Sequence, residues 1–223
     1  MEWQIFGETV VFWLGPIPVT TTMITSSVIS LALVGAALAL RAALSRSPAG
    51  MPAALALLTI EWLDRLVRDV AGRAEPALVI LSGSLFLFIA ACNLAGQLPG
   101  VRPPTASLAM TSALAIIVFL AVPVAGIRAR GVRGYLLGYF RPNPLLLPLH
   151  VISELSRTLA LSMRLFGNMM SGHLVVALLV ALTGFLVPMP LMALDMLIGL
   201  LQAYIFAVLA TVYVGAAIRT GEA

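Results

Sequence analysis

Charged residues are scarce in this chain of 223 residues: they make up 10% of it, whereas hydrophobic residues make up 61%. Soluble domains carry about 25% charged residues, so the composition excludes a water-soluble globular protein. It also excludes a disordered chain, because disorder requires low hydrophobicity and high charge. The apolar residues form continuous runs, unlike the alternating segments of a transmembrane β-barrel. The class that remains is a polytopic helical membrane protein.

Lysine is absent, and all thirteen basic residues are arginine. Most of them lie between apolar runs, so they indicate membrane topology and not a nucleic-acid partner. The single cysteine, Cys92, excludes an intrachain disulfide, and a metal site would need further ligands. We therefore expect no metal ion and no cofactor. The first residues lack the basic region of a signal peptide, so we expect no cleavage.

Five apolar runs are long enough to cross a membrane, which takes about 20 residues. They cover residues 19–40, 76–98, 105–127, 145–187 and 191–218. Gly184, Pro188 and Pro190 separate the last two runs, which predicts a turn between two long helices. The chain shows no internal repeat and no separate soluble segment. We therefore predict an all-α protein with five transmembrane helices in one membrane domain over residues 1–223.

Residues 51–73 form a different pattern, in which one helical face is apolar and the other is charged. The apolar positions are Leu55, Leu58, Trp62, Leu66 and Val70. The charged positions form acid-first pairs four residues apart, which support a helix: Glu61–Arg65, Asp64–Arg68 and Asp69–Arg73. This pattern predicts an amphipathic helix on the membrane surface or against a soluble partner.

The arginines predict the orientation of the chain. With five spans, only Arg102 falls on one side of the membrane, and ten arginines fall on the other. The ten are Arg41, Arg46, Arg65, Arg68, Arg73, Arg128, Arg130, Arg133, Arg141 and Arg219. Arginine-rich loops stay in the cytoplasm, so the N-terminus should lie outside and the C-terminus inside. Four of the ten fall in a segment after residue 127 that contains Gly and Pro, which we expect to be a linker.

Ionisable side chains within the membrane cost about 2.5–3.5 kcal/mol each on insertion scales, so they are functional candidates. The fourth run carries a stripe of residues that alternate spacings of four and three: His150, Glu154, Arg157, Leu161, Arg164, Asn168 and Ser171. On a helix these positions share one face, and a polar face must contact protein or water. His173 lies on nearly the opposite face. Asp195 and Gln202 share a face of the last run.

If the turn is centred near Gly184, His173 is level with Asp195 toward the outer side. Arg164 is then near mid-membrane, level with Gln202 and its neighbours. Glu154 and His150 lie toward the cytoplasm. This layout is typical of an ion path in two halves, with a guanidinium that keeps its proton between them.

Structural alternatives stay open for several of these polar residues. Arg157 would snorkel or pair with Glu154, and His150 would lie at the interface. Asn93 and Gln97 would cap a helix or hydrogen-bond between helices. Arg164 would form a structural ion pair with Asp195.

Residues 162–173, Ser-Met-Arg-Leu-Phe-Gly-Asn-Met-Met-Ser-Gly-His, resemble the signature of the a subunit of F-type ATP synthases. That family carries an Arg-Leu-Phe-Gly-Asn core. Residues 201–209 look like its C-terminal block, and residues 93–99 and 104–107 are similar to its blocks on either side of the outer loop. The resemblance extends over residues 20–218 in the family's order.

The resemblance implies a non-catalytic, ion-translocating subunit without an ATP site, which couples H⁺ or Na⁺ movement to ATP synthesis or hydrolysis. It implies a long tilted hairpin of the last two helices against a ring of c subunits, with Arg164 as the essential arginine. Asn168 and Gln202 match its polar neighbours. His173 and Asp195 match the pair of the outer half-channel, with the histidine first as in mitochondrial members.

The resemblance to the family is weaker for the residues expected on the cytoplasmic side of the membrane. The family's inner acid usually lies where His150 stands, Glu154 lies one turn closer to Arg164, and Arg157 matches a position that is often basic. The implied partners are the c ring, b-type peripheral stalk subunits, the soluble catalytic head and membrane lipid, in a bacterial plasma membrane. The alternative is a proton-coupled secondary transporter, which would usually show internal repeats.

Overall fold

The computed structural model describes residues 10–14, 17–46, 50–72, 75–98, 101, 103–140, 147–184 and 187–219. Within these residues, five helices are long and apolar enough to cross a membrane. They are α1 (Thr21–Arg46), α3 (Pro76–Ala95), α4 (Leu108–Phe140), α5 (Leu147–Thr183) and α6 (Met189–Arg219). This confirms the prediction of a polytopic, helical membrane protein. Arg73, Arg102 and Arg141, which entered the orientation argument, lie outside the described residues.

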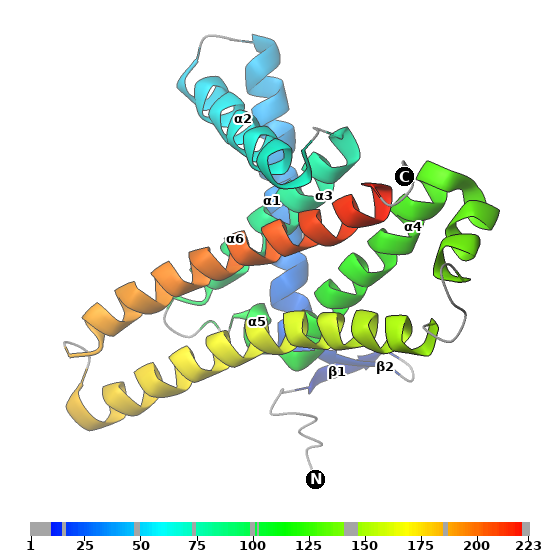
Figure 1. Ribbon diagram of the computed structural model, residues 1–223. Coiled ribbons are helices and arrows are strands. Elements are labelled where there is room, and N and C mark those ends of the chain that lie inside the picture. Colours follow the sequence, from blue (N-terminus) through cyan, green and yellow to red (C-terminus); the bar gives the residue numbers. More distant parts are fainter. Residues whose placement is uncertain are drawn as a thin grey trace.

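A small β-hairpin, which the apolar runs of the sequence do not predict, precedes the first span. Strands β1 (Val10–Leu14) and β2 (Ile17–Thr20) pair antiparallel, with an irregularity in register between Val10 and Phe12. Both strands contain β-branched residues, and β1 adds two aromatic ones, which favour extended backbone. Figure 1 shows the hairpin beside the lower end of α1.

Helix α2 (Met51–Ala71) is the predicted amphipathic helix. The acid-first pairs Glu61–Arg65 and Asp64–Arg68 form ion pairs of 2.6 and 2.8 Å, and the bond to Glu61 raises the pKa of Arg65. The helix ends at Gly72, whose positive φ of 76° favours glycine.

The buried side of α2 differs from the predicted apolar face. Leu66 is buried, but Leu55, Leu58 and Trp62 are exposed. The buried positions are Ala53, Ala56, Leu63, Leu66, Val67 and Ala71. Their alanines let α2 approach α1, α3 and α6 closely, which a count of large apolar residues does not predict.

Helix α4 continues beyond the predicted third span. A 3₁₀ turn, η1 (Pro104–Ala106), precedes it, and the expected linker after residue 127 is helical as far as Phe140. The backbone leaves helical geometry only at Gly131, where φ is 73° and ψ is 164°. Glycine accepts this conformation at little cost, so two helical segments meet there.

Helices α5 and α6 form a long hairpin. They contain 37 and 31 residues, which corresponds to lengths of about 55 and 46 Å. Because a hydrocarbon core is about 30 Å thick, both helices must tilt strongly to stay within it. Figure 1 shows them crossing α1 obliquely, which agrees with the expected tilted hairpin. α6 packs mainly on α3, and α5 packs mainly on α4.

Two apolar clusters hold these helices together. The larger one joins α3, α4, α5 and α6, and it contains the fully buried side chains of Ile89, Leu165 and Phe206. The smaller one adds α2 and includes Val67 and Val214. One polar contact is buried near them: the hydroxyl groups of Ser82 and Thr211 lie 2.6 Å apart. The packing therefore fixes one face of the α5–α6 hairpin against the rest of the bundle.

Candidate functional site

Arg164 lies on a part of α5 that the rest of the chain does not cover. Its neighbour Leu165 is fully buried and anchors the helix backbone at this level. A rotation of about 100° per residue then turns Arg164 out of the core. The Arg164 side chain is exposed, and within the described residues it has no ion-pair partner. A structural ion pair with Asp195, the alternative left open above, is not formed.

Asn168 and Gln202 join the two helices of the hairpin one turn further along α5. The Asn168 side-chain amide donates to Gln202 Oε1 at 3.0 Å. Gln202 is buried, whereas Asn168 is exposed. The Gln202 Nε2 group has no hydrogen-bond partner within the described part of the chain. A buried amide donor without a partner costs about 1–3 kcal/mol, so this group is available to a further acceptor.

Asp195 is buried against the backbone of α5. Its carboxylate packs on Gly172, where an added Cβ would overlap Oδ1 and lie 2.8 Å from Cγ. Gln97 Nε2 donates to Asp195 Oδ2 at 3.1 Å, so the end of α3 also reaches this carboxylate. Gly172 is therefore needed for the close approach of the two helices.

His173 and Asn93 both lie at the C-terminal end of α3. His173 is half-buried, and its Nε2 is 3.2 Å from the position of a Cβ on Gly96. No hydrogen bond joins His173 to Asp195, although both side chains reach the end of α3.

Asn93 bonds two neighbouring elements. Its Nδ2 donates to the Gly199 carbonyl at 2.8 Å, and Thr105 Oγ1 donates to its Oδ1 at 2.6 Å. The structural alternative for Asn93 and Gln97, hydrogen bonding between helices, is thus what the structure contains.

A cavity of about 230 Å³ opens between α5 and α6 beside Asp195. Ser171, Gly172 and Leu194 also line it. A water molecule takes about 30 Å³, so the cavity has room for several. The buried carboxylate is therefore next to a space that can hold water. No set of three potential metal ligands converges in the part of the chain that the structure describes.

The polar residues in the first half of α5 are not brought together by hydrogen bonds in the way that Asn168, Gln202, Asp195 and Gln97 are. Glu154 is half-buried, and within the described residues it forms no ion pair with Arg157. The Arg157 guanidinium carbon instead lies 4.4 Å from the centre of the Tyr213 ring, in a cation–π contact. The side chain of His150 lies outside the described residues. Leu161, within the predicted polar stripe, is buried in the core.

Sequence reasoning did not single out Thr105, Gly172 or Tyr213 as parts of this site. Thr105 and Gly172 were quoted only within matching segments, and their side chains offer no titratable group. Tyr213 lies in an apolar run where an aromatic residue is ordinary. Each becomes relevant through a contact between helices that are distant in sequence, which periodicity within one helix does not reveal.

Comparisons with known proteins agree with the resemblance. The family model described as "ATP synthase A chain" matches residues 20–215. ATP synthase subunit a 2 of Bradyrhizobium sp. (strain BTAi1) is 43% identical over 98% of this chain and 97% of its own length. ATP synthase subunit a 1 of Chlorobium luteolum is 50% identical over 70% of each chain, and ATP synthase subunit a of Albidiferax ferrireducens is 45% identical over 73% and 70%. The chain therefore belongs to the ATP synthase A chain family.

Proposed function

We propose that this chain is the stator subunit beside the rotating c ring, and that Arg164 meets the ring carboxylates one after another. Family membership makes the chain one subunit of a multi-subunit complex in a membrane. The observation that carries the proposal is the position of Arg164 on a membrane-spanning helix, where it is exposed and has no ion-pair partner among the described residues. In this role, residues 1–223 form one membrane domain.

A free guanidinium at membrane depth is unfavourable unless protein or water covers it. Arg164 falls within the candidate span Ile152–Thr183, and its own chain leaves it exposed. The nearby Gly167 is also open, since a Cβ there would meet no atom within 4 Å. Small residues let a second helix approach closely, so this face suits a helical partner that carries a carboxylate.

The chemistry follows from the fixed charge of arginine. When a ring carboxylate nears Arg164, the guanidinium stabilises the ionised form, and the bound H⁺ or Na⁺ leaves to one half-channel. The carboxylate is reloaded from the other half-channel after it has passed. Because arginine keeps its own proton, the two half-channels stay separated at this point. Asn168 and Gln202 would orient the carboxylate or the arginine. Among the described residues Gln202 Nε2 has no hydrogen-bond partner, so it is a donor for this role.

We assign the outer half-channel to the cluster around Asp195. His173, Gln97 and Asn93 lie around this carboxylate, and the cavity between α5 and α6, which Asp195 lines, can hold water that connects Asp195 to the outside. The inner half-channel would use Glu154 and His150, with the Arg157–Tyr213 contact at its side.

The remaining parts of the proposal concern the surroundings of the chain. The N-terminus lies outside and the C-terminus in the cytoplasm of a bacterial plasma membrane. The b-type stalk and the catalytic head are further partners. The alternative of a proton-coupled secondary transporter has no supporting observation, since the family match covers residues 20–215.

The test is ATP-driven proton pumping in inverted vesicles that contain the complete complex. Arg164→Ala should abolish pumping and ATP synthesis while the complex still assembles. Arg164→Lys should also fail largely, because the planar fork is lost. The matched control is Arg133→Ala, an exposed arginine outside the candidate spans. Pumping near wild type in an assembled Arg164→Ala complex would refute the role of Arg164.

A further inference from the structure

A second cavity lies at the other end of the bundle, away from Arg164 and Asp195. It measures about 290 Å³ and lies between α3, α4 and α6, partly open to the outside. Most of its lining is apolar, including Leu78, Leu81, Ala121, Val124, Val214 and Ile218. The two charged side chains in the lining are Glu75, which is half-buried, and Arg128, which is exposed.

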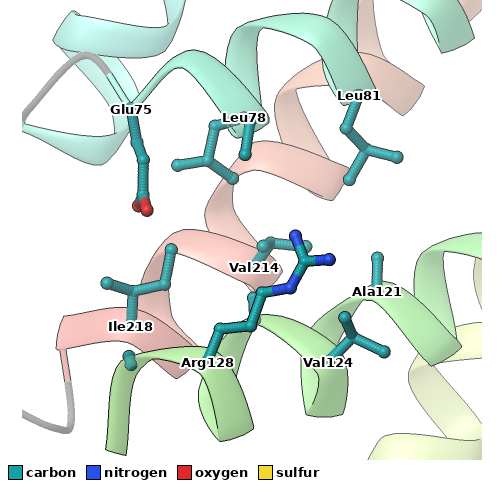
Figure 2. Close-up of a pocket in the computed structure, with 11 residues that line it drawn as sticks. Glu75, Leu78, Leu81, Ala121, Val124, Arg128, Val214 and Ile218 are labelled. Carbon is teal, nitrogen blue, oxygen red and sulfur yellow. The ribbon is translucent and has the colours of Figure 1, made fainter.

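The two charged side chains border the cavity from different elements and form no ion pair with each other. Figure 2 shows Glu75 reaching in from the start of α3 and Arg128 from α4, with the guanidinium in front of Val214. The ion pairs of the described residues lie in α2, and none joins Glu75 to Arg128. An anion and a cation that are held apart suit a ligand with both charges.

The cavity lies where three candidate spans end. The span in α3 begins at Pro76, the span in α4 ends at Ala129, and the span in α6 ends at Ile218. Charged side chains beside these ends are at the level of lipid headgroups, while Leu81 and Val124 extend the cavity toward the hydrocarbon core. The location therefore favours a lipid over a soluble ligand.

We propose that this cavity binds the headgroup and first acyl carbons of a phospholipid with a primary ammonium, a phosphatidylethanolamine. Arg128 would hold the phosphate, and Glu75 would accept hydrogen bonds from the ammonium. Glu75 disfavours an anionic lipid by repulsion, and a quaternary choline ammonium has no hydrogen to donate. Pockets that bind drug-sized ligands measure about 300–1,000 Å³, so a cavity of this volume suits a headgroup and not a whole lipid.

The experiment uses the complete, purified complex in nanodiscs with a photoreactive phosphatidylethanolamine, whose label is mapped by mass spectrometry. Labelling should fall on peptides that contain Leu78 or Val214. Unlabelled phosphatidylethanolamine should compete better than phosphatidylcholine or phosphatidylglycerol. Arg128→Gln should weaken competition by the ethanolamine and choline lipids alike, by about tenfold. Glu75→Gln should remove the preference for ethanolamine over choline.

Matched controls are Arg133→Gln and Glu61→Gln, which change exposed charges outside the cavity and should leave labelling unchanged. Equal labelling in Arg128→Gln and Arg133→Gln would overturn the proposal. It would mean that Arg128 does not bind the lipid phosphate and extends into water like Arg133. Stronger competition by phosphatidylglycerol, or a neighbouring subunit crosslinked here in place of lipid, would also overturn it. Pumping should persist in Glu75→Gln and Arg128→Gln, so failure of this proposal is distinct from failure of the role of Arg164.

Discussion

Substitution of Gly172 by alanine should displace the Asp195 carboxylate although no titratable residue is replaced. The added Cβ would overlap Asp195 Oδ1 and lie 2.8 Å from Cγ, so rotation of the carboxylate alone cannot relieve the clash. Either Asp195 turns away from Gln97, or α5 and α6 separate. Gly35→Ala in α1 is the matched control, because a Cβ at Gly35 meets no atom within 4 Å.

The stability change expected for Gly172→Ala combines two costs and one gain. Overpacking of a tight contact costs about 1–3 kcal/mol. Loss of the hydrogen bond between Gln97 and the Asp195 carboxylate costs about 1.5–3 kcal/mol. Alanine regains about 0.5–1 kcal/mol of helix stability, which Gly35→Ala gains as well. The net loss is about 1.5–5.5 kcal/mol. Even a loss of about 2 kcal/mol lowers the population with Asp195 correctly placed by about thirtyfold.

The assay compares the two alanine variants in vesicles and in thermal unfolding. Gly172→Ala should pump protons at about a tenth of the rate of Gly35→Ala or less, and it should unfold at lower temperature. In an Asp195→Ala background, Gly172→Ala should cost little stability, because the clashing oxygen is gone. If Gly172→Ala pumps and unfolds like Gly35→Ala, the contact between Gly172 and Asp195 is wrong.

Three further predictions concern topology, the buried network and the outer half-channel. Cysteines placed at Ser45 and Gly131 should react with a membrane-impermeant label only from the cytoplasmic side. Asn93→Ala should destabilise the purified complex by about 1–3 kcal/mol in thermal unfolding, because it leaves the Gly199 carbonyl and the Thr105 hydroxyl without partners. His173→Ala and Asp195→Ala should each slow proton flux, with a non-additive combined effect. The exchange His173→Glu with Asp195→His should recover part of that flux, and normal flux in both single variants would exclude the pair.

The spans could be predicted from the sequence because apolar length is a property of one segment. Residues 76–98 and 105–127 were expected to cross, and α3 and α4 do contain such spans. The continuation of α4 to Phe140 could not be predicted in the same way. The glycines and prolines after residue 127 indicated a linker, but whether helix continues past a glycine such as Gly131 depends on the backbone conformation that the surroundings allow.

The site could be predicted only as far as helical spacing reaches. Asn168 and Gln202 were expected as neighbours of Arg164, and the hairpin does join them by a hydrogen bond. The structural alternative for Arg157 was to pair with Glu154 or to snorkel, and the structure shows a contact with Tyr213 of another helix. Which partner a long side chain selects depends on tertiary packing, which one sequence does not contain.

One side of α5 is packed against the bundle, and the other side, which carries Arg164, is exposed. Leu165 and Met169 are buried against the bundle, so the backbone that carries Arg164 is held at a fixed level. The arginine side chain itself has no partner among the described residues and is free to change conformation. A rotating partner needs both properties. Each arriving carboxylate must meet the guanidinium at the same depth in the membrane, and the arginine side chain must then change conformation to stay in contact as the carboxylate moves past. The proposed mechanism therefore requires both the rigid packing of α5 and an Arg164 side chain that is not held in an ion pair within its own chain.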